Sequence, residues 1–352
     1  MPPFTPGRTL SRAFYAEILR PLLGDRLHDA CLIGEGSDVL GYDQRISMDH
    51  DWGPRVTLFF ASEEECTAVR GKVLAQLPDS FQEFPTRKDR QASNICITTA
   101  TRWLREHLRI EDIDALRAWD WLAFPQQHLL QFTGGALFCG TLGHYQHARE
   151  ILAWYPLDVW RWMMAAQWYF VWSSERLIFR AAEAGDALGV RLLLHKLIRI
   201  CVELVFLQNK AYRPYDKWLG TAFAQIDESH GFAQEIVSIL NSQDLREQTS
   251  LWQKLLVQLG ENHNWLGITR PVAPQIRPYE VGIDGAVRPY RIFNAAGYTN
   301  ACTESIADPA LKSLACVGAL DQMANATDAF INFSPWNTIV RDGFRAQLTQ
   351  EP

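Results

Sequence analysis

The stretch Gly34-Glu-Gly-Ser-Asp-Val-Leu-Gly41, followed after a short spacer by Ser47-Met-Asp-His-Asp-Trp52, is the most informative part of this chain. It combines a glycine–serine turn with two acids, Asp49 and Asp51, that are separated by a single residue. Side chains of an extended segment alternate between its faces, so both carboxylates would point to the same side. Adjacent carboxylates repel each other, and a divalent cation between them relieves that repulsion. Because glycine and serine can offer backbone N–H groups and a hydroxyl to phosphate, the stretch predicts a metal site beside a phosphate-binding turn.

The composition is that of a globular protein, and the net charge limits the classes of molecule that it is expected to bind. A length of 352 residues favours two domains, and 47% hydrophobic with 21% charged residues is ordinary. The net charge of −6 argues against binding of a long nucleic acid, which relies on a basic surface. A nucleotide, whose contacts are few and local, stays possible. The thirteen tryptophans indicate a bulky helical core, with a stacking platform for a base as the alternative.

Neither metal-binding cysteines nor a targeting segment is indicated. The seven cysteines are scattered and include no Cys-x-x-Cys pair, so neither a zinc site nor a disulfide framework is expected. The first residues lack the apolar run of a signal peptide. The uncharged stretch Trp162–Ser174 is too short to span a bilayer, which needs roughly 20 apolar residues. We therefore expect a soluble, cytoplasmic protein without a membrane partner.

The first part of the chain mixes strand and helix patterns. Apolar runs predict strands at 30–33, 56–61 and 94–99, and helical spacing predicts helices at 10–23, 63–77 and 101–108. Ser62 stands where the second of these helices needs an N-cap. We expect a small α/β domain over residues 1–140.

The rest of the chain is dominated by helical spacing, which covers 145–154, 158–183, 187–210 and 232–259. Pro156 and Pro214 stand where helices would begin or end. Residues 268–289 are rich in proline and predict an irregular, extended connection, followed by short helical patterns at 309–316 and 321–331. The expected fold class is therefore α+β, with an all-α helical domain over residues 141–352.

The combination of motifs resembles a known superfamily. The glycine spacing fits neither the dinucleotide fingerprint nor the phosphate loop of P-loop enzymes. Gly36-Ser37 with Asp49 and Asp51 resembles the signature of the nucleotidyltransferase superfamily, which includes kanamycin nucleotidyltransferase and DNA polymerase beta. Residues 34–60 together with 214–223 look like an uncharacterised two-domain family within it. The resemblance implies a mixed sheet flanked by helices, a helical bundle, and ATP or another nucleoside triphosphate as substrate with two Mg²⁺ ions.

The resemblance also implies roles for individual residues. Gly36 and Ser37 would hold the β- and γ-phosphates, while Asp49 and Asp51 would bind the metals that bridge the triphosphate and the attacking oxygen. Arg45, in the loop before the acids, would add a cation at the phosphates. The implied reaction transfers a nucleoside monophosphate to a hydroxyl of an unknown small molecule or protein. The alternative for the two acids, which the residues favour when the resemblance is set aside, is a solvated loop that caps neighbouring backbone.

Two features depart from the superfamily's pattern. Gly53-Pro54 interrupts the expected strand just after Asp51, which predicts a bulge or an edge position there. Active members bring a third carboxylate from a later strand, but Cys96 stands at that place in the 94–99 strand.

The missing third acid leaves two functions open. Glu83, Asp120 and Glu175 are candidates to replace it. If none of them does, the chain is a catalytically degenerate nucleotide-binding or interaction protein that retains the fold.

Two further stretches carry functional candidates. The 187–210 helix places Arg191, His195, Arg199 and Glu203 at intervals of four, which predicts either a solvated, internally paired stripe or a face on which Lys196 or Arg199 meets phosphate. The aromatic stretch 212–218 offers Lys217 as a nucleotide contact and Tyr215 as part of an acceptor pocket. The alternative for 212–218 is a helix connection packed by its aromatic rings.

Overall fold

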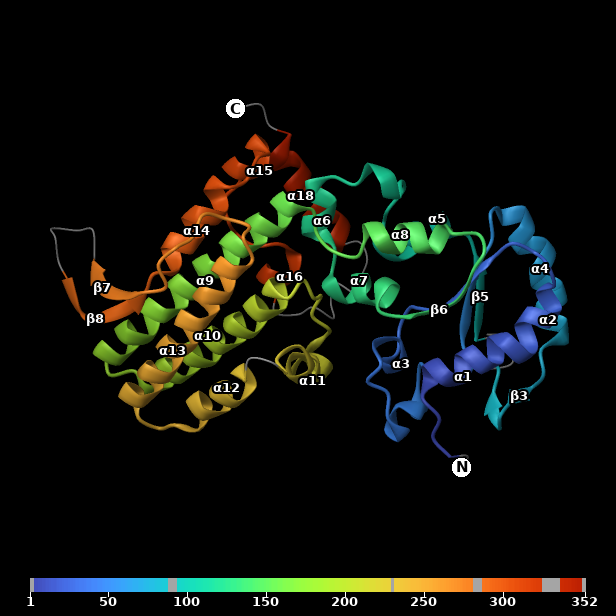
Figure 1. Ribbon diagram of the computed structural model, residues 1–352, viewed down its shortest axis with the longest axis horizontal. Helices are drawn as coiled ribbons and strands as arrows, with labels where there is room; N and C mark the ends of the chain where they lie inside the picture. The colour runs from blue at the N-terminus through green and yellow to red at the C-terminus, as the bar shows by residue number, and fades with distance from the viewer. Residues whose placement is uncertain (1–2, 88–93, 229–230, 281–286, 325–335, 350–352) are drawn as a thin grey trace. The chain divides into compact units, whose positions relative to one another are not determined.

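The structure is a computed structural model that describes residues 3–87, 94–228, 231–280, 287–324 and 336–349 (Figure 1). The chain forms two compact units, the first from residues 1–117 and 124–154 and the second from 118–123 and 155–352. The predicted boundary at residue 140 differs from this division, because the first unit continues through helix α8, His144–Ile151.

The first unit is built on a four-stranded mixed sheet in the order β5-β2-β1-β6. Its strands are β1 (Asp29–Leu32), β2 (Val56–Phe59), β5 (Ile95–Thr98) and β6 (Ala136–Gly140). β1 runs antiparallel to β2 and β6, whereas β2 and β5 are parallel. Three of these strands lie where the sequence predicts them, so the mixed sheet is confirmed. β6 was not predicted, and its pairing with β1 has an irregularity between Ala30 and Cys31.

Short helices and a hairpin complete the first unit. The predicted 10–23 helix is a continuous segment of α1 (Gly7–Phe14), a π-helical turn (Tyr15–Leu19) and α2 (Arg20–Leu23). Helix α4 (Glu63–Gln76) begins as predicted, with the Ser62 hydroxyl accepting from the Glu65 N–H at 3.3 Å. The other elements are α3 (Ser37–Leu40), β3 (Ser80–Phe81), β4 (Phe84–Pro85), α5 (Ala100–Leu108), a 3-10 turn (Ile113–Ala115) and α7 (Gln126–Thr133).

Hydrogen bonds to Asp29 connect the start of α8 to the sheet. This fully buried carboxylate of β1 accepts from the N–H groups of Leu142 at 3.0 Å, Gly143 at 2.8 Å and Tyr145 at 2.9 Å. The first N–H groups of a helix have no partner within it, so a carboxylate there satisfies them. One side chain of β1 thereby joins α8 to the sheet across more than a hundred residues.

The second unit is mainly helical. Three long helices, α9 (Leu157–Glu183), α10 (Ala187–Gln208) and α13 (Leu245–Trp265), run side by side, and α14 (Ala295–Glu304) packs on α9 (Figure 1). The shorter helices are α6 (Ala118–Ala123), α11 (Asp216–Ile226), α12 (Phe232–Asn241), α15 (Pro309–Ser313), α16 (Leu320–Met323) and α18 (Trp336–Leu348). The predicted 321–331 helix is described only to residue 324.

The single helix predicted over 232–259 is wrong. α12 ends at Asn241 and α13 starts at Leu245. Asp244 caps the new helix, since its Oδ1 accepts from the N–H groups of Arg246 at 2.7 Å and Glu247 at 2.9 Å. The apolar spacing continues across the break, and α12 and α13 pack against each other.

The proline-rich segment is more regular than predicted. β7 (Ile276–Glu280) and β8 (Val287–Phe293) pair as an antiparallel two-stranded sheet, and residues 281–286 lie outside the described part. Proline is tolerated there because both strands of such a sheet are edges, where an N–H can be missing. The second unit is therefore not all-α as expected.

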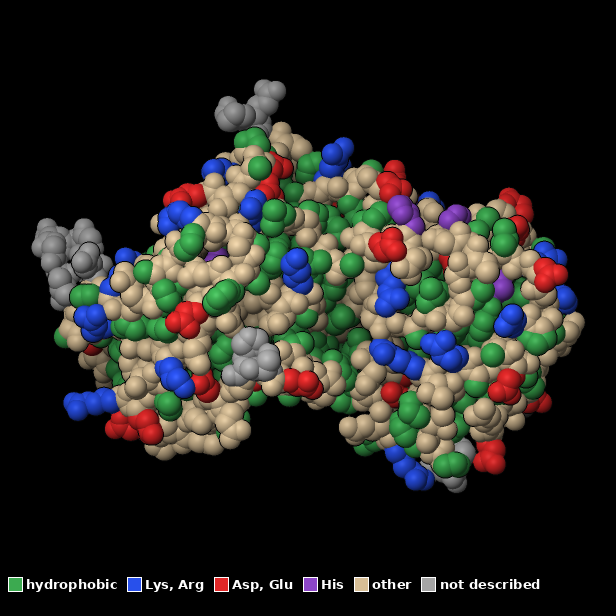
Figure 2. Space-filling model, in the orientation of Figure 1, with side chains coloured by type: hydrophobic (Ala, Val, Ile, Leu, Met, Phe, Trp, Pro, Cys, Tyr) green, Lys and Arg blue, Asp and Glu red, His purple; other side chains and the backbone are tan. Residues whose placement is uncertain are grey.

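Charges of both signs are interspersed on the protein surface. On the face shown in Figure 2, Lys and Arg side chains and acids are scattered, singly or in small groups, among hydrophobic and uncharged surface. This agrees with a chain whose net charge is −6. Among the described helices, none is both long and apolar enough to cross a membrane.

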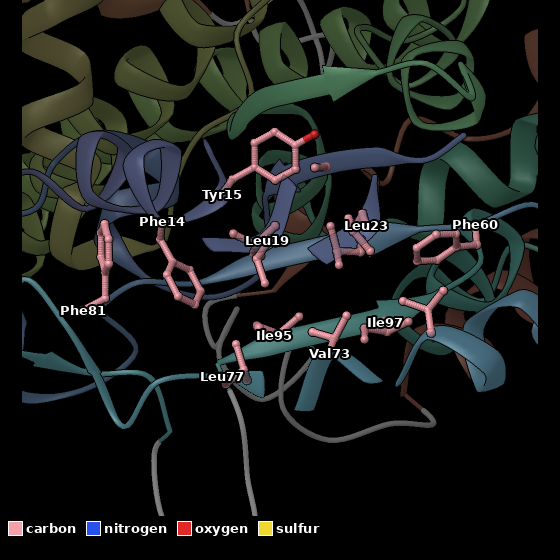
Figure 3. Close-up of a cluster of buried hydrophobic side chains, with 14 of the residues drawn as sticks. Phe14, Tyr15, Leu19, Leu23, Phe60, Val73, Leu77, Phe81, Ile95 and Ile97 are labelled. Carbon is pink, nitrogen blue, oxygen red and sulfur yellow. The ribbon is translucent and has the colours of Figure 1, made fainter. Parts of the chain in front are cut away.

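The core of the first unit packs helices onto the sheet (Figure 3). Phe14 and Leu19 from the first helical segment meet Val73 of α4 and Ile97 of β5, and all four are at most 2% exposed. This packing fixes the strands whose ends carry the glycine turn and the acids.

Candidate functional site

The glycine turn lies against the loop that carries the acids. Gly36 precedes α3 and has a φ of 113°, a backbone conformation that residues other than glycine rarely adopt. A Cβ atom at this position would clash with the carbonyl oxygen of Asp51 and with Oδ1 of Asp38. The backbone of Asp51 therefore touches the turn, as the two halves of the motif require.

An ion pair ties this turn to the start of β2. Arg55 Nη2 lies 2.5 Å from Asp38 Oδ1 and donates to the Glu35 carbonyl oxygen at 2.7 Å. The Asp38 side chain is fully buried, and that of Arg55 is 13% exposed. Burial raises the pKa of the Asp38 carboxyl, while the Arg55 guanidinium opposes that rise. The second carboxylate oxygen, Oδ2, is buried without a hydrogen-bond partner among the described residues.

Arg8 and Asp43 hold the loop from the other side. Arg8 of α1 donates to the carbonyl oxygens of Asp38 at 3.1 Å and Val39 at 2.5 Å, which lie in the short helix α3. Asp43 accepts from the Gly7 N–H at 2.7 Å and from the Trp52 indole at 3.0 Å. These bonds restrain the loop around the acids at both of its ends.

The two acids are not in an extended segment, so that prediction is wrong. Asp49 is the last residue of a 3-10 helix, Arg45–Asp49, and Asp51 has a left-handed φ of 47°. The helix forms because Gln44 and Ser47 cap it reciprocally, with the Gln44 N–H donating to the Ser47 hydroxyl at 3.1 Å.

The expected effect of Pro54 on the strand is also wrong. β2 starts at Val56, after the proline, and pairs with β1 on one side and β5 on the other. Pro54 therefore causes neither a bulge in the strand nor an edge position.

The residues predicted to contact nucleotide, metal or acceptor are divided between the two units. Asp49 is 63% exposed with Oδ1 2.8 Å from His50 Nδ1, and Arg45 is exposed at the start of the 3-10 helix. Tyr215 and Lys217 belong to the second unit, where Tyr215 precedes α11 and the Lys217 ammonium lies 5.1 Å from the Trp218 ring centroid. The roles of these last two residues stay predictions.

The candidates for the third acid lie in different parts of the fold. Glu83 forms the exposed turn of the β3–β4 hairpin with φ 69°. Asp120 of α6 lies 3.9 Å from Arg341 in the second unit. Cys96 of β5 pairs in register with Thr57. Within the described ranges, no group of three or more His, Cys, Asp or Glu side chains is arranged to hold a metal.

Glu175 is the most deeply buried of these candidates. It lies in α9 and accepts from the Phe293 N–H at 2.9 Å, the Trp252 indole at 3.3 Å and the Gln253 amide at 3.4 Å. Burial raises its pKa to about 7, although these hydrogen bonds act in the opposite direction. Its contacts join β8 to α9 and α13.

Sequence reasoning missed the residues that assemble the motif. Asp38 lies in the quoted stretch 34–41, whereas Arg55 lies three residues beyond the quoted stretch 47–52. No spacing rule predicts that they pair, because the contact depends on the antiparallel arrangement of β1 and β2.

These observations define a mixed α/β protein with a small mixed sheet and a mainly helical C-terminal region. Residues 121–219 match a family model described as a domain of unknown function (DUF4037). The match runs from α6 into α11, so it includes Tyr215 and Lys217 but not the Gly36–Asp51 motif. No curated protein and no solved structure was found to match the chain.

Proposed function

We propose that this protein is a magnesium-dependent nucleotidyltransferase that moves a nucleoside monophosphate from ATP or another triphosphate to a hydroxyl of a small molecule or protein. The contact between Gly36 and the Asp51 backbone carries the proposal. β1 and β2 are antiparallel, so the turn after Leu32 and the acids before Val56 meet at one end of the sheet. The Gly36-Ser37 turn and the backbone of Asp51 are therefore neighbours, which supports a site that combines the turn with the acids.

The residues at this place fit a magnesium-bound triphosphate. Mg²⁺ is commonly held by one or two carboxylates together with substrate phosphates, so Asp49, Asp51 or both would be its protein ligands. When bound, the metal would neutralise charge on the phosphates as the α-phosphate is attacked. The backbone at Gly36 and Ser37 would donate to the phosphates, and exposed Arg45 would add a cation. Arg55 and Asp38 act as positioning residues that hold the turn against the acids.

A second candidate is a nucleotide-binding or interaction protein without turnover. Two observations favour it: Asp49 already pairs with His50, and β5 carries Cys96 where active relatives of the resembled superfamily have an acid. Such a protein would bind a triphosphate through the same turn but transfer nothing.

Binding and transfer can be tested separately. We expect isothermal titration calorimetry to detect ATP binding that requires Mg²⁺ and weakens at least tenfold in Asp49→Asn and Asp51→Asn. Asp25→Asn is the matched control, because Asp25 is an exposed acid of the same unit outside the motif. The absence of magnesium-dependent binding in the parent protein would refute both candidates.

Label transfer then decides between the two. ATP labelled at the α-phosphate is incubated with the protein, Mg²⁺ and pools of small molecules and proteins. Transfer that is lost in Asp51→Asn supports the enzyme. Binding without transfer to any pool supports the binding protein.

A further inference from the structure

The second unit contains a cavity of about 470 Å³ that the proposed nucleotide site in the first unit does not use. Its wall comes from α9, α10, α11 and α16, with Ala324 directly after α16, so it lies wholly within that unit. Sites for small molecules typically measure about 300–1,000 Å³. The cavity therefore has the size of a binding site for a metabolite.

Charges in and behind this wall are balanced. Arg199 bridges two acids, with Nε 2.7 Å from Glu203 and Nη2 2.7 Å from Asp216. Arg213, which is 3% exposed, lies 3.7 Å from Glu203 and 3.8 Å from Asp321. Two cations, Lys196 and Arg199, and three carboxylates line the cavity, and Arg213 behind the lining brings the cations to three. The pairing of Arg199 with Glu203 also supports the internally paired interpretation of the stripe on α10.

Three polar groups at the cavity are left for a ligand. Lys196 stands one turn before Arg199 on α10 and forms no ion pair within the described ranges. Arg199 donates through Nε and Nη2, and Asp216 accepts through Oδ1, so Nη1 of Arg199 and Oδ2 of Asp216 have no hydrogen-bond partner within those ranges. Lys196, Arg199 and Asp216 all line the cavity, so the residues around this space carry two cationic donors and one carboxylate oxygen that no neighbouring side chain uses.

We propose that this cavity binds a zwitterion with an apolar body, specifically an α-amino acid with a large apolar side chain. Its carboxylate would meet Lys196 and Nη1 of Arg199, and its ammonium would meet Oδ2 of Asp216. The apolar body would lie on Phe170, Ile200 and Met323, which also line the cavity. A balanced wall gives no net attraction to a ligand of one charge, whereas a ligand carrying both charges satisfies both kinds of group. The proposal is independent of the nucleotidyltransferase proposal, because it uses none of the motif residues.

The first test compares three ligands of one shape. Titration calorimetry without nucleotide uses L-phenylalanine, 3-phenylpropanoate, which lacks the ammonium, and 2-phenylethylamine, which lacks the carboxylate. We expect L-phenylalanine to bind at least tenfold more tightly than either analogue, and L-leucine to bind as well. Equal binding of 3-phenylpropanoate would show a simple anion site, and failure of both amino acids to bind would also overturn the proposal.

The second test locates the site. Lys196→Met should weaken L-phenylalanine at least tenfold and leave 2-phenylethylamine unchanged, because only the carboxylate loses its partner. Arg191→Met is the matched control: it removes one positive charge from the same helix at an exposed position that does not line the cavity. Both positions are exposed, so thermal melting should match that of the parent protein. Equal weakening by both variants would assign the effect to overall charge and overturn the proposal.

Discussion

Replacing Arg55 by Met should destabilise the first unit, because the buried carboxylate of Asp38 loses its cationic partner. Asp38 is fully buried and Arg55 is 13% exposed, with 2.5 Å between them. Removing one partner of a buried ion pair costs about 3–5 kcal/mol, because an uncompensated charge stays in the interior. The lost bond to the Glu35 carbonyl adds to this cost. Urea unfolding at pH 7, followed by circular dichroism, measures the difference.

The pH dependence of the unfolding free energy shows whether the buried charge of Asp38 causes this loss of stability. Burial already raises the pKa of Asp38, and without Arg55 nothing of comparable strength opposes that rise. An acid whose pKa is higher in the folded than in the unfolded state binds protons on folding, so stability rises as the pH falls. The deficit of Arg55→Met should therefore shrink on acidification. Adding Asp38→Asn should recover part of the loss at pH 7, since the neutral amide leaves no buried charge.

The matched control is Arg20→Met, which removes an exposed arginine of α2. An exposed position away from such contacts should change stability by no more than about 0.5 kcal/mol. The reasoning fails if Arg55→Met costs less than about 1 kcal/mol. It also fails if its deficit neither shrinks at low pH nor responds to Asp38→Asn.

Four further substitutions test other parts of the fold and the site. Because burial raises the pKa of Glu175 from 4.5 to about 7, stability should fall by about 3 kcal/mol as pH rises between those values; Glu175→Gln should abolish this slope in urea titrations. Gly36→Ala should cost about 2 kcal/mol or more from backbone strain and abolish magnesium-dependent ATP binding in calorimetry. Gly71→Ala, inside α4 with open space around it, should instead stabilise by about 0.5–1 kcal/mol. Asp29→Ala removes the acceptor of three N–H groups at α8 and should cost about 1–3 kcal/mol in thermal unfolding; an unchanged melting temperature would contradict that role.

Local patterns in the sequence predicted much of the secondary structure. The strands β1, β2 and β5 and the Ser62 cap of α4 follow from apolar runs and a single hydroxyl next to them. The same reasoning failed at residues 232–259, where apolar spacing continues through the break that Asp244 caps. It failed also at Asp49, where a reciprocal cap makes a 3-10 helix in place of a strand.

By itself, the sequence determined the strands β1, β2 and β5 and most of the longer helices, and it placed Gly36, Ser37, Asp49 and Asp51 on two neighbouring segments. Periodicity and capping act over a few residues, so they can be read along the chain. Only the tertiary structure decided that β6 joins the sheet and that Asp29 holds α8. It alone brought the Asp51 backbone to the turn and assembled the cavity of the second unit. These features depend on strand order and helix packing, which join residues far apart in sequence and leave no local pattern.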